Sequence, residues 1–129
     1  NVRVAGNIVN EDILGSLEYA CTVANTRLIV VLGHTRCGAI ESACDQLELG
    51  NITSLLKKIR PAIEAETNTL SNRTGSNIPF INEVSLHNIQ NSIDLMRKNS
   101  TIIRELENKG KIRILGAIYD VETGSVTFL

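Results

Sequence analysis

The sequence predicts an α/β fold with a mostly parallel sheet, and three observations favour it. Residues 28–32 and 111–119 are apolar runs of strand length, rich in β-branched residues, as expected for strands buried on both faces. Helical patterns alternate with these runs, which is typical of a parallel sheet with right-handed connections. The length of 129 residues suits one domain and is large enough for a substantial core.

The first fifty residues predict strand, helix, strand and helix in that order. Residues 2–4 look like the tail of a strand that begins without a preceding turn. Asn10, followed by two acidic residues, predicts a helix start, and apolar residues at steps of three and four continue that helix over residues 10–25. After the first buried run, a helix is expected at about residues 37–49, closed by Gly50.

The rest of the chain predicts further helices and two strands. The helical patterns share an apolar stripe at steps of three and four and occupy residues 52–66, 79–99 and 101–108. Pro61 bends or divides the first of these. Residues 66–77 are polar and turn-rich, which predicts a mobile surface loop. The buried run 111–119 is the next strand, and a short edge strand is expected at 125–129.

Composition excludes several classes of function. A formal net charge of −1 gives no electrostatic case for nucleic acid, and 3% aromatic residues without tryptophan leave little stacking surface. No apolar run reaches the roughly 18 residues that span a bilayer, so we expect no membrane segment. The first residues do not resemble a signal peptide, and three cysteines argue against a disulfide framework. We therefore expect a cytoplasmic protein.

His34 and Cys37 are the candidate metal ligands. Gly33 ends the first buried run and Gly38 begins the next helical pattern, so both side chains lie where a strand gives way to a helix. In open α/β sheets, ligands bind at the carboxyl ends of strands. An imidazole and a thiolate at such a turn are suitable ligands for one zinc ion.

The other two cysteines are expected to be structural. Cys44 lies seven residues beyond Cys37 on the same predicted helix, roughly 10 Å away, which is too far to share a metal ion. Cys21 belongs to an apolar stripe that faces the core. Both are predicted to be small buried hydrophobic residues.

The turn around His34 resembles the H-T-x-C-G-A signature of the β-class carbonic anhydrases, since residues 34–39 read HTRCGA. Three further stretches agree with that family in order and spacing. They are RVAGN at residues 3–7 (R-N-A-G-N in the family), GSLEYA at 15–20 and GAIYDVETG at 116–124. These motifs cover the chain nearly end to end.

The resemblance implies a fold, an activity and an assembly. The fold would be three-layered, with a mostly parallel central sheet flanked by helices. The activity would be that of carbonate dehydratase, a lyase: zinc-dependent, reversible hydration of carbon dioxide to bicarbonate. Family members are dimers or higher assemblies, so we expect a homo-oligomer, either a dimer or a tetramer.

The resemblance also assigns residues around the metal. His34 and Cys37 match two zinc ligands of the family. Gly6 and Asn7 are placed beside the metal pocket, where they are expected mainly to shape the turn after the first strand. Gly38 either allows close packing where its helix begins or presents a backbone N–H to an anion such as bicarbonate, and both roles stay open.

One family motif has no counterpart in these residues. The third zinc ligand of the family is the cysteine of a C-x-D-x-R motif upstream of R-N-A-G-N, whose Asp-Arg pair acts at the metal. We therefore expect residues 1–129 to be a single domain that is incomplete at its N-terminus and lacks the first, central strand. The cysteine would come from upstream of residue 1. Alternatively, a partner chain supplies a strand or the sheet is rearranged.

Two other functions stay open. A domain without the third ligand and the Asp-Arg pair, and so with no catalytic residue beyond the two zinc ligands, is a candidate for an inactive structural or regulatory module. A second alternative keeps the fold and the metal but hydrolyses carbon disulfide or carbonyl sulfide. Zinc content and carbon dioxide hydration distinguish the first alternative, and a direct substrate assay distinguishes the second.

Overall fold

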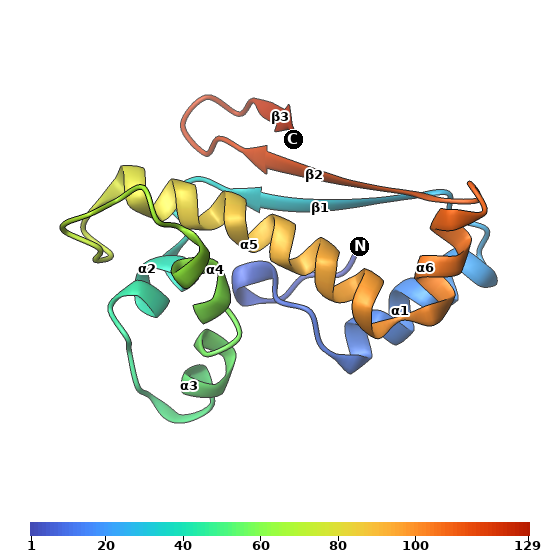
Figure 1. Cartoon of the computed structure of the whole chain (residues 1–129), viewed down its shortest axis with the longest axis horizontal. Coiled ribbons are helices and arrows are strands. Elements are labelled where there is room, and N and C mark those ends of the chain that lie inside the picture. The colour runs from blue at the N-terminus through green and yellow to red at the C-terminus, as the bar shows by residue number, and fades with distance from the viewer.

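The centre of the molecule is a three-stranded sheet. The structure, a computed structural model, describes residues 1–129. Strands β1 (Leu28–His34) and β2 (Arg113–Tyr119) pair in parallel, and β3 (Val126–Phe128) pairs antiparallel to β2 at the edge. All the helices lie on one side of this sheet (Figure 1). The predicted α/β class, the positions of both apolar strands and the short edge strand are confirmed.

The helices lie close to their predicted positions. They are α1 (Glu11–Thr22), α2 (Gly38–Cys44), α3 (Gly50–Leu56), α4 (Arg60–Ala65), α5 (Ile78–Asn99) and α6 (Thr101–Asn108), after a 3₁₀ turn, η1 (Ala5–Asn7). Pro61 lies in the first turn of α4, so the predicted helix over residues 52–66 is divided there. None of these helices combines the length and hydropathy needed to cross a bilayer.

Side-chain caps explain where three helices begin. The Oδ1 atom of Asn10 accepts a hydrogen bond from the N–H of Ile13, and Asn77 and Ser100 accept in the same way at the starts of α5 and α6. Such caps satisfy backbone donors that have no partner within the helix and contribute about 1 kcal/mol each. The predicted start at Asn10 is confirmed.

Two predicted elements are wrong. The helix expected to run to residue 49 ends at Cys44, because Gln46 adopts a left-handed conformation (φ 54°), and Gly50 (φ 47°) opens α3 instead of closing α2. The strand tail expected at residues 2–4 is not a strand. Val4 is extended, but no neighbouring strand pairs with it.

Helix α5 is the main support of the sheet. Ile89 packs into the space above two glycines, Gly33 on β1 and Gly116 on β2. A Cβ atom at either position would lie 2.8 Å from the Ile89 side chain. The absence of side chains there lets α5 approach β1 and β2 closely. Two clusters of buried apolar residues, which lie around α2 and α4 and around α1 and α6, meet along this helix.

The two faces of β1 differ in burial. Ile29 and Val31 face α5 and are 6% and 5% exposed. Leu28, Val30 and Leu32 point to the opposite face and are 48%, 41% and 45% exposed. The prediction that this strand is buried on both faces is therefore wrong for the described chain, because no helix or second sheet covers the outer face.

One edge of β1 also has free backbone groups. The C=O of Arg27 accepts from Arg113 and the N–H of Thr35 donates to Tyr119, so the odd-numbered residues of β1 point their backbone groups toward β2. The even-numbered residues point to the other edge. There, the C=O of Leu32 accepts a hydrogen bond from the side chain of Asn7 at 3.1 Å. This edge borders the cavity described below.

Residues 66–77 form the predicted polar loop, and its beginning is tied to the core. Glu66 is 1% exposed, and one of its carboxylate oxygens accepts from the N–H groups of Asn68 and Thr69. The other oxygen pairs with the Arg73 guanidinium at 2.6 Å. That guanidinium lies over the ring of Phe80 at the start of α5. The beginning of the loop is thus held by an ion pair whose carboxylate is buried.

Candidate metal centre

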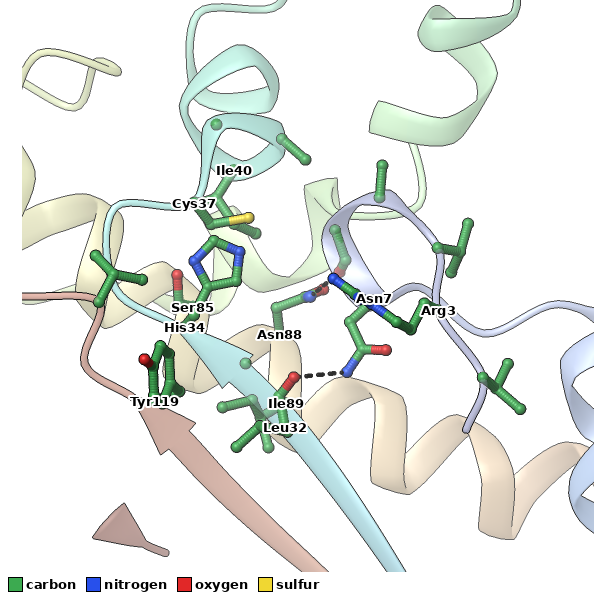
Figure 2. Close-up of a pocket in the computed structure, with 18 of the residues that line it drawn as sticks. Arg3, Asn7, Leu32, His34, Cys37, Ile40, Ser85, Asn88, Ile89 and Tyr119 are labelled. Carbon is green, nitrogen blue, oxygen red and sulfur yellow. Dashed lines mark hydrogen bonds between the residues drawn. The ribbon is translucent and has the colours of Figure 1, made fainter. Parts of the chain in front are cut away.

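His34 and Cys37 lie at the carboxyl end of β1. His34 is the last residue of the strand, and Cys37 is the residue immediately before α2. Both line a cavity of about 1110 Å³ that extends to the N-terminal segment and η1. In Figure 2 the ring of His34 lies beneath the sulfur of Cys37, and the sulfur points toward the side of Arg3 and Asn7. The sequence therefore predicted two donors that the fold brings together.

The imidazole of His34 is oriented by its own turn. Its Nδ1 atom lies 2.9 Å from the carbonyl oxygen of Thr35. Because a carbonyl oxygen can only accept, this contact selects the tautomer of the neutral imidazole that has its proton on Nδ1 and its lone pair on Nε2. Histidine ligands of metals are typically held in this way, with one ring nitrogen donating to a carbonyl and the other free to coordinate.

The other cysteines lie elsewhere in the core, as predicted. Cys21 packs with the cluster around the sheet and α6, and Cys44 with the cluster around α2 and α4. Burial raises the pKa of Cys21, and burial followed by the neighbouring charge of Asp45 raises the pKa of Cys44 to about 11. A raised pKa keeps a thiol protonated, whereas a metal ligand must be a thiolate. Neither cysteine lines the cavity.

The two residues between the candidate ligands are held from several sides. Thr35 donates its N–H to the C=O of Tyr119 at 2.9 Å and accepts from the N–H of Val121 at 3.1 Å. Arg36 adopts φ 53°, a left-handed conformation that is unfavourable by roughly 1–2 kcal/mol for a residue with a side chain. Its N–H donates to the Oδ1 of Asn82 on α5 at 3.0 Å.

Gly6 and Asn7 form a left-handed turn beside the cavity. Gly6 has φ 68°, and a Cβ atom there would lie 2.6 Å from Ile59, so glycine is required on both counts. Asn88 donates to the C=O of Gly6 at 2.6 Å, and Ser92 donates to the C=O of Asn7 at 3.1 Å. Helix α5 thus holds this turn, and Asn7 in turn reaches β1.

Sequence reasoning missed the polar residues of α5. Ser85, Asn88 and Ser92 are buried among apolar neighbours, and the Oδ1 of Asn88 has no hydrogen-bond partner. Ser85 and Asn88 line the cavity. Their spacing of three and four residues within an apolar helix was the available signal, because small polar residues on a buried face require partners.

Gly38 also lines the cavity, but close packing does not explain it. A Cβ atom at this position would meet no atom within 4 Å. The expectation that Gly38 permits close packing at the start of its helix is therefore wrong, because the space beside it is open.

The donor set partly fits a zinc ion. Imidazole nitrogen and thiolate sulfur are preferred zinc ligands, and a catalytic zinc site has three protein ligands. No group of three or more His, Cys, Asp or Glu residues lies close enough to hold a metal ion. His34 and Cys37 thus suit two positions of a zinc site, and these residues supply no third donor.

Comparison with known proteins identifies the family. A sequence model described as carbonic anhydrase matches residues 1–126. The chain belongs to the β-carbonic anhydrase family. The recognised motifs and strands β1 and β2 fall within that match, which ends at the first residue of β3.

Two bacterial proteins are among the relatives of this β-carbonic anhydrase chain. It is 30% identical over 128 residues to carbonic anhydrase 2 of Mycobacterium tuberculosis H37Rv, covering 95% of this chain and 58% of the relative. It is 30% identical over 125 residues to a carbonic anhydrase of Mycolicibacterium smegmatis, covering 97% and 60%. The chain therefore spans about three-fifths of the length of these relatives.

A solved structure confirms the fold. The β-carbonic anhydrase CafA of Aspergillus fumigatus superposes with a TM-score of 0.85 at 23% identity, covering 99% of this chain and 62% of the other. At this identity, the similarity supports the arrangement of helices and strands and not the details of the site. The α/β fold implied by the motifs is thus shown independently of them.

Proposed function

We propose that this chain is part of a zinc-dependent carbonic anhydrase that interconverts carbon dioxide and bicarbonate. The observation that carries the proposal is the meeting of His34 and Cys37 at the end of β1, with the Nε2 of His34 free to coordinate. Family membership supports it, because the recognised relatives bear the name carbonic anhydrase.

Zinc, when bound, supplies a Lewis acid that lowers the pKa of a water ligand toward about 7. His34 and Cys37 hold the ion, and the Thr35 carbonyl keeps the imidazole in the tautomer that coordinates. Apolar side chains that line the cavity, including Leu32, Ile40 and Ile89, offer a dry surface for an uncharged gas. Gly6, Asn7 and Gly38 shape the pocket around the substrate.

The third protein ligand, in this proposal, is a cysteine carried by an extended segment from outside residues 1–129. Two features support such a segment. The cavity, at about 1110 Å³, is at the upper end of the range usual for small-molecule sites, although carbon dioxide has only three atoms. The cavity also separates residues 1–4 from the edge of β1 where even-numbered backbone groups point outward. An added strand would satisfy those groups, each of which is unfavourable by about 1–3 kcal/mol when buried without a partner.

We further propose a cytoplasmic homo-oligomer. The exposed apolar face of the sheet, with Leu28, Val30 and Phe128, supports association, and the β-carbonic anhydrases of Sordaria macrospora are described as tetrameric. Three free cysteines suit a reducing compartment. Multi-angle light scattering and cell fractionation test these two statements.

The experiment compares two cysteines on the same helical segment. The protein is expressed from its complete reading frame, and zinc per chain and stopped-flow carbon dioxide hydration are measured. The variants are Cys37→Ala and, as the matched control, Cys44→Ala. We expect Cys37→Ala to lose zinc and hydration together, whereas Cys44→Ala keeps the zinc of the folded fraction because Cys44 lies outside the cavity.

Three results would count against this function. Zinc retained at full stoichiometry in Cys37→Ala would mean that the metal is bound elsewhere. Zinc-loaded wild type without hydration activity would favour an inactive module. Activity on carbonyl sulfide or carbon disulfide without hydration of carbon dioxide would reassign the substrate and keep the metal centre.

A further inference from the structure

We propose that Asn82 is a positioning residue for the metal-ligand turn, and that its side chain sets the spacing between His34 and Cys37. This inference rests on the proposed zinc site. It concerns a residue of α5 that lies outside every recognised family motif and does not itself contact the metal.

The turn between the two ligands contains a conformation that needs support. Only Thr35 and Arg36 separate His34 from Cys37, and Arg36 is left-handed (φ 53°). Residues other than glycine, asparagine and aspartate seldom adopt this conformation, and when they do, surrounding contacts hold them there. The direction in which the chain leaves Arg36 decides where the sulfur of Cys37 points.

Asn82 provides a contact to the backbone of that residue. Its Oδ1 atom accepts the N–H of Arg36 at 3.0 Å. Asn82 lies between Ile81 and Val84, both fully buried, so its own backbone is fixed by the core. No other side chain of α5 hydrogen-bonds to residues 34–37. Asn82 therefore transmits the position of a rigid helix to the turn.

The side-chain ion pair of Arg36 does less to fix the conformation of its backbone. Its guanidinium pairs with Glu122 at 2.5 Å, but the two side chains are 51% and 60% exposed. Exposed ion pairs contribute little and long side chains adapt to small movements. The neighbouring residue Thr35 is held by Tyr119 at the end of β2 and by Val121 just beyond it. The turn is thus fixed to the sheet on the His34 side and to α5 on the Cys37 side.

The consequence concerns metal affinity. Metal sites require donor positions accurate to about 0.5 Å, and loss of outer contacts that orient ligands typically weakens binding 10- to 100-fold. Because Asn82 acts through the backbone of Arg36, we expect the lower end of that range. Removing its side chain leaves the fold in place and widens the range of separations between Nε2 and the sulfur.

The test measures metal binding in the complete protein with Asn82→Ala, Asn82→Asp and the control Asn91→Ala. Asn91 lies on the same helix, and its side chain makes no hydrogen bond in the structure. The readouts are zinc affinity by chelator competition, the absorption spectrum of the cobalt(II)-substituted protein, and thermal unfolding of the metal-free protein. We expect Asn82→Ala to bind zinc about 10-fold more weakly with an altered cobalt spectrum. Asn82→Asp, which keeps an acceptor, and Asn91→Ala should stay within about twofold of wild type.

A double variant separates positioning from general damage. Glycine adopts positive φ without support, so Arg36→Gly introduced into Asn82→Ala should recover part of the lost affinity and the wild-type cobalt spectrum. An unchanged zinc affinity in Asn82→Ala, an equal loss in Asn82→Asp, or no recovery in the double variant would each overturn the inference and leave the proposed function intact. Absence of metal from the wild type would overturn both.

Discussion

The two faces of β1 carry similar residues in different surroundings. Ile29 and Val31 are buried under α5, whereas Leu28, Val30 and Leu32 on the same strand are nearly half exposed. A continuous apolar run normally marks a strand covered on both faces. The difference teaches that an apolar run predicts a strand but not which of its faces is covered, since in this chain only the face of β1 toward α5 is buried.

The largest expected effect is on the α5 face. Ile89→Ala removes the side chain that fills the space above Gly33 and Gly116, and we expect the free energy of unfolding to fall by about 2–5 kcal/mol. The matched control, Leu28→Ala on the outer face, should lower it by less than about 1 kcal/mol in the monomer. Urea unfolding monitored by circular dichroism measures both. Equal losses would mean that the outer face is also buried in solution.

A pair of nearly isosteric changes makes the comparison sharper. Val31→Thr places a hydroxyl group under α5 and should destabilise the protein by about 1–3 kcal/mol. Val30→Thr places the same group on the exposed face, where we expect a change within about 0.5 kcal/mol. Repeating both at low and high protein concentration is informative. A penalty for Val30→Thr that grows with concentration would locate an interface between copies on the outer face.

Lowering the pH tests the buried side of the molecule, because Glu66 is the one buried carboxylate. Burial alone would raise the pKa of Glu66, but hydrogen bonds from Thr69, Asn68 and Arg73 outweigh burial and hold the pKa below its ordinary 4.5. A depressed pKa stabilises the fold above the unfolded-state value, and this contribution is lost as pH falls through the folded-state value. We expect Glu66→Gln to reduce the loss of stability below about pH 4.5, measured by urea unfolding across pH. A variant with the wild-type acid profile would show that Glu66 is not responsible.

The smallest expected effect is at Gly38, on the cavity side of the turn. Gly38→Ala adds a methyl group into open space, so the melting temperature should stay nearly constant and the free energy of unfolding within about 0.5 kcal/mol. Carbon dioxide hydration should fall if that methyl group occupies the substrate pocket. Gly6→Ala is the contrasting variant, because its positive φ and the contact with Ile59 predict clear destabilisation.

Helices were predicted correctly where the residues of the helix itself carry the pattern. The helix at residues 101–108 and the long helix ending at Asn99 follow from apolar spacing. The end of α2 does not, because Leu47 and Leu49 continue an apolar pattern although both are exposed in the structure. The strand expected at residues 2–4 failed for a related reason, since a strand needs a neighbour that this chain does not provide.

The same distinction holds for the candidate metal centre. His34 and Cys37 are found from a motif because they are close in sequence and lie where a strand ends. Asn82 and Asn88 are about fifty residues away, and only the packing of α5 on the sheet brings them to the turns they hold. A contact set by tertiary packing leaves no signal in local spacing, apart from small polar residues on a buried helix face.

The central claim is that one zinc ion is held by His34 and Cys37. Anomalous diffraction at the zinc edge from crystals of the complete protein tests it most directly. We predict a single peak about 2.0–2.1 Å from the Nε2 of His34 and about 2.3 Å from the sulfur of Cys37. A zinc peak bound by other residues, with these two side chains turned away from each other, would contradict the account.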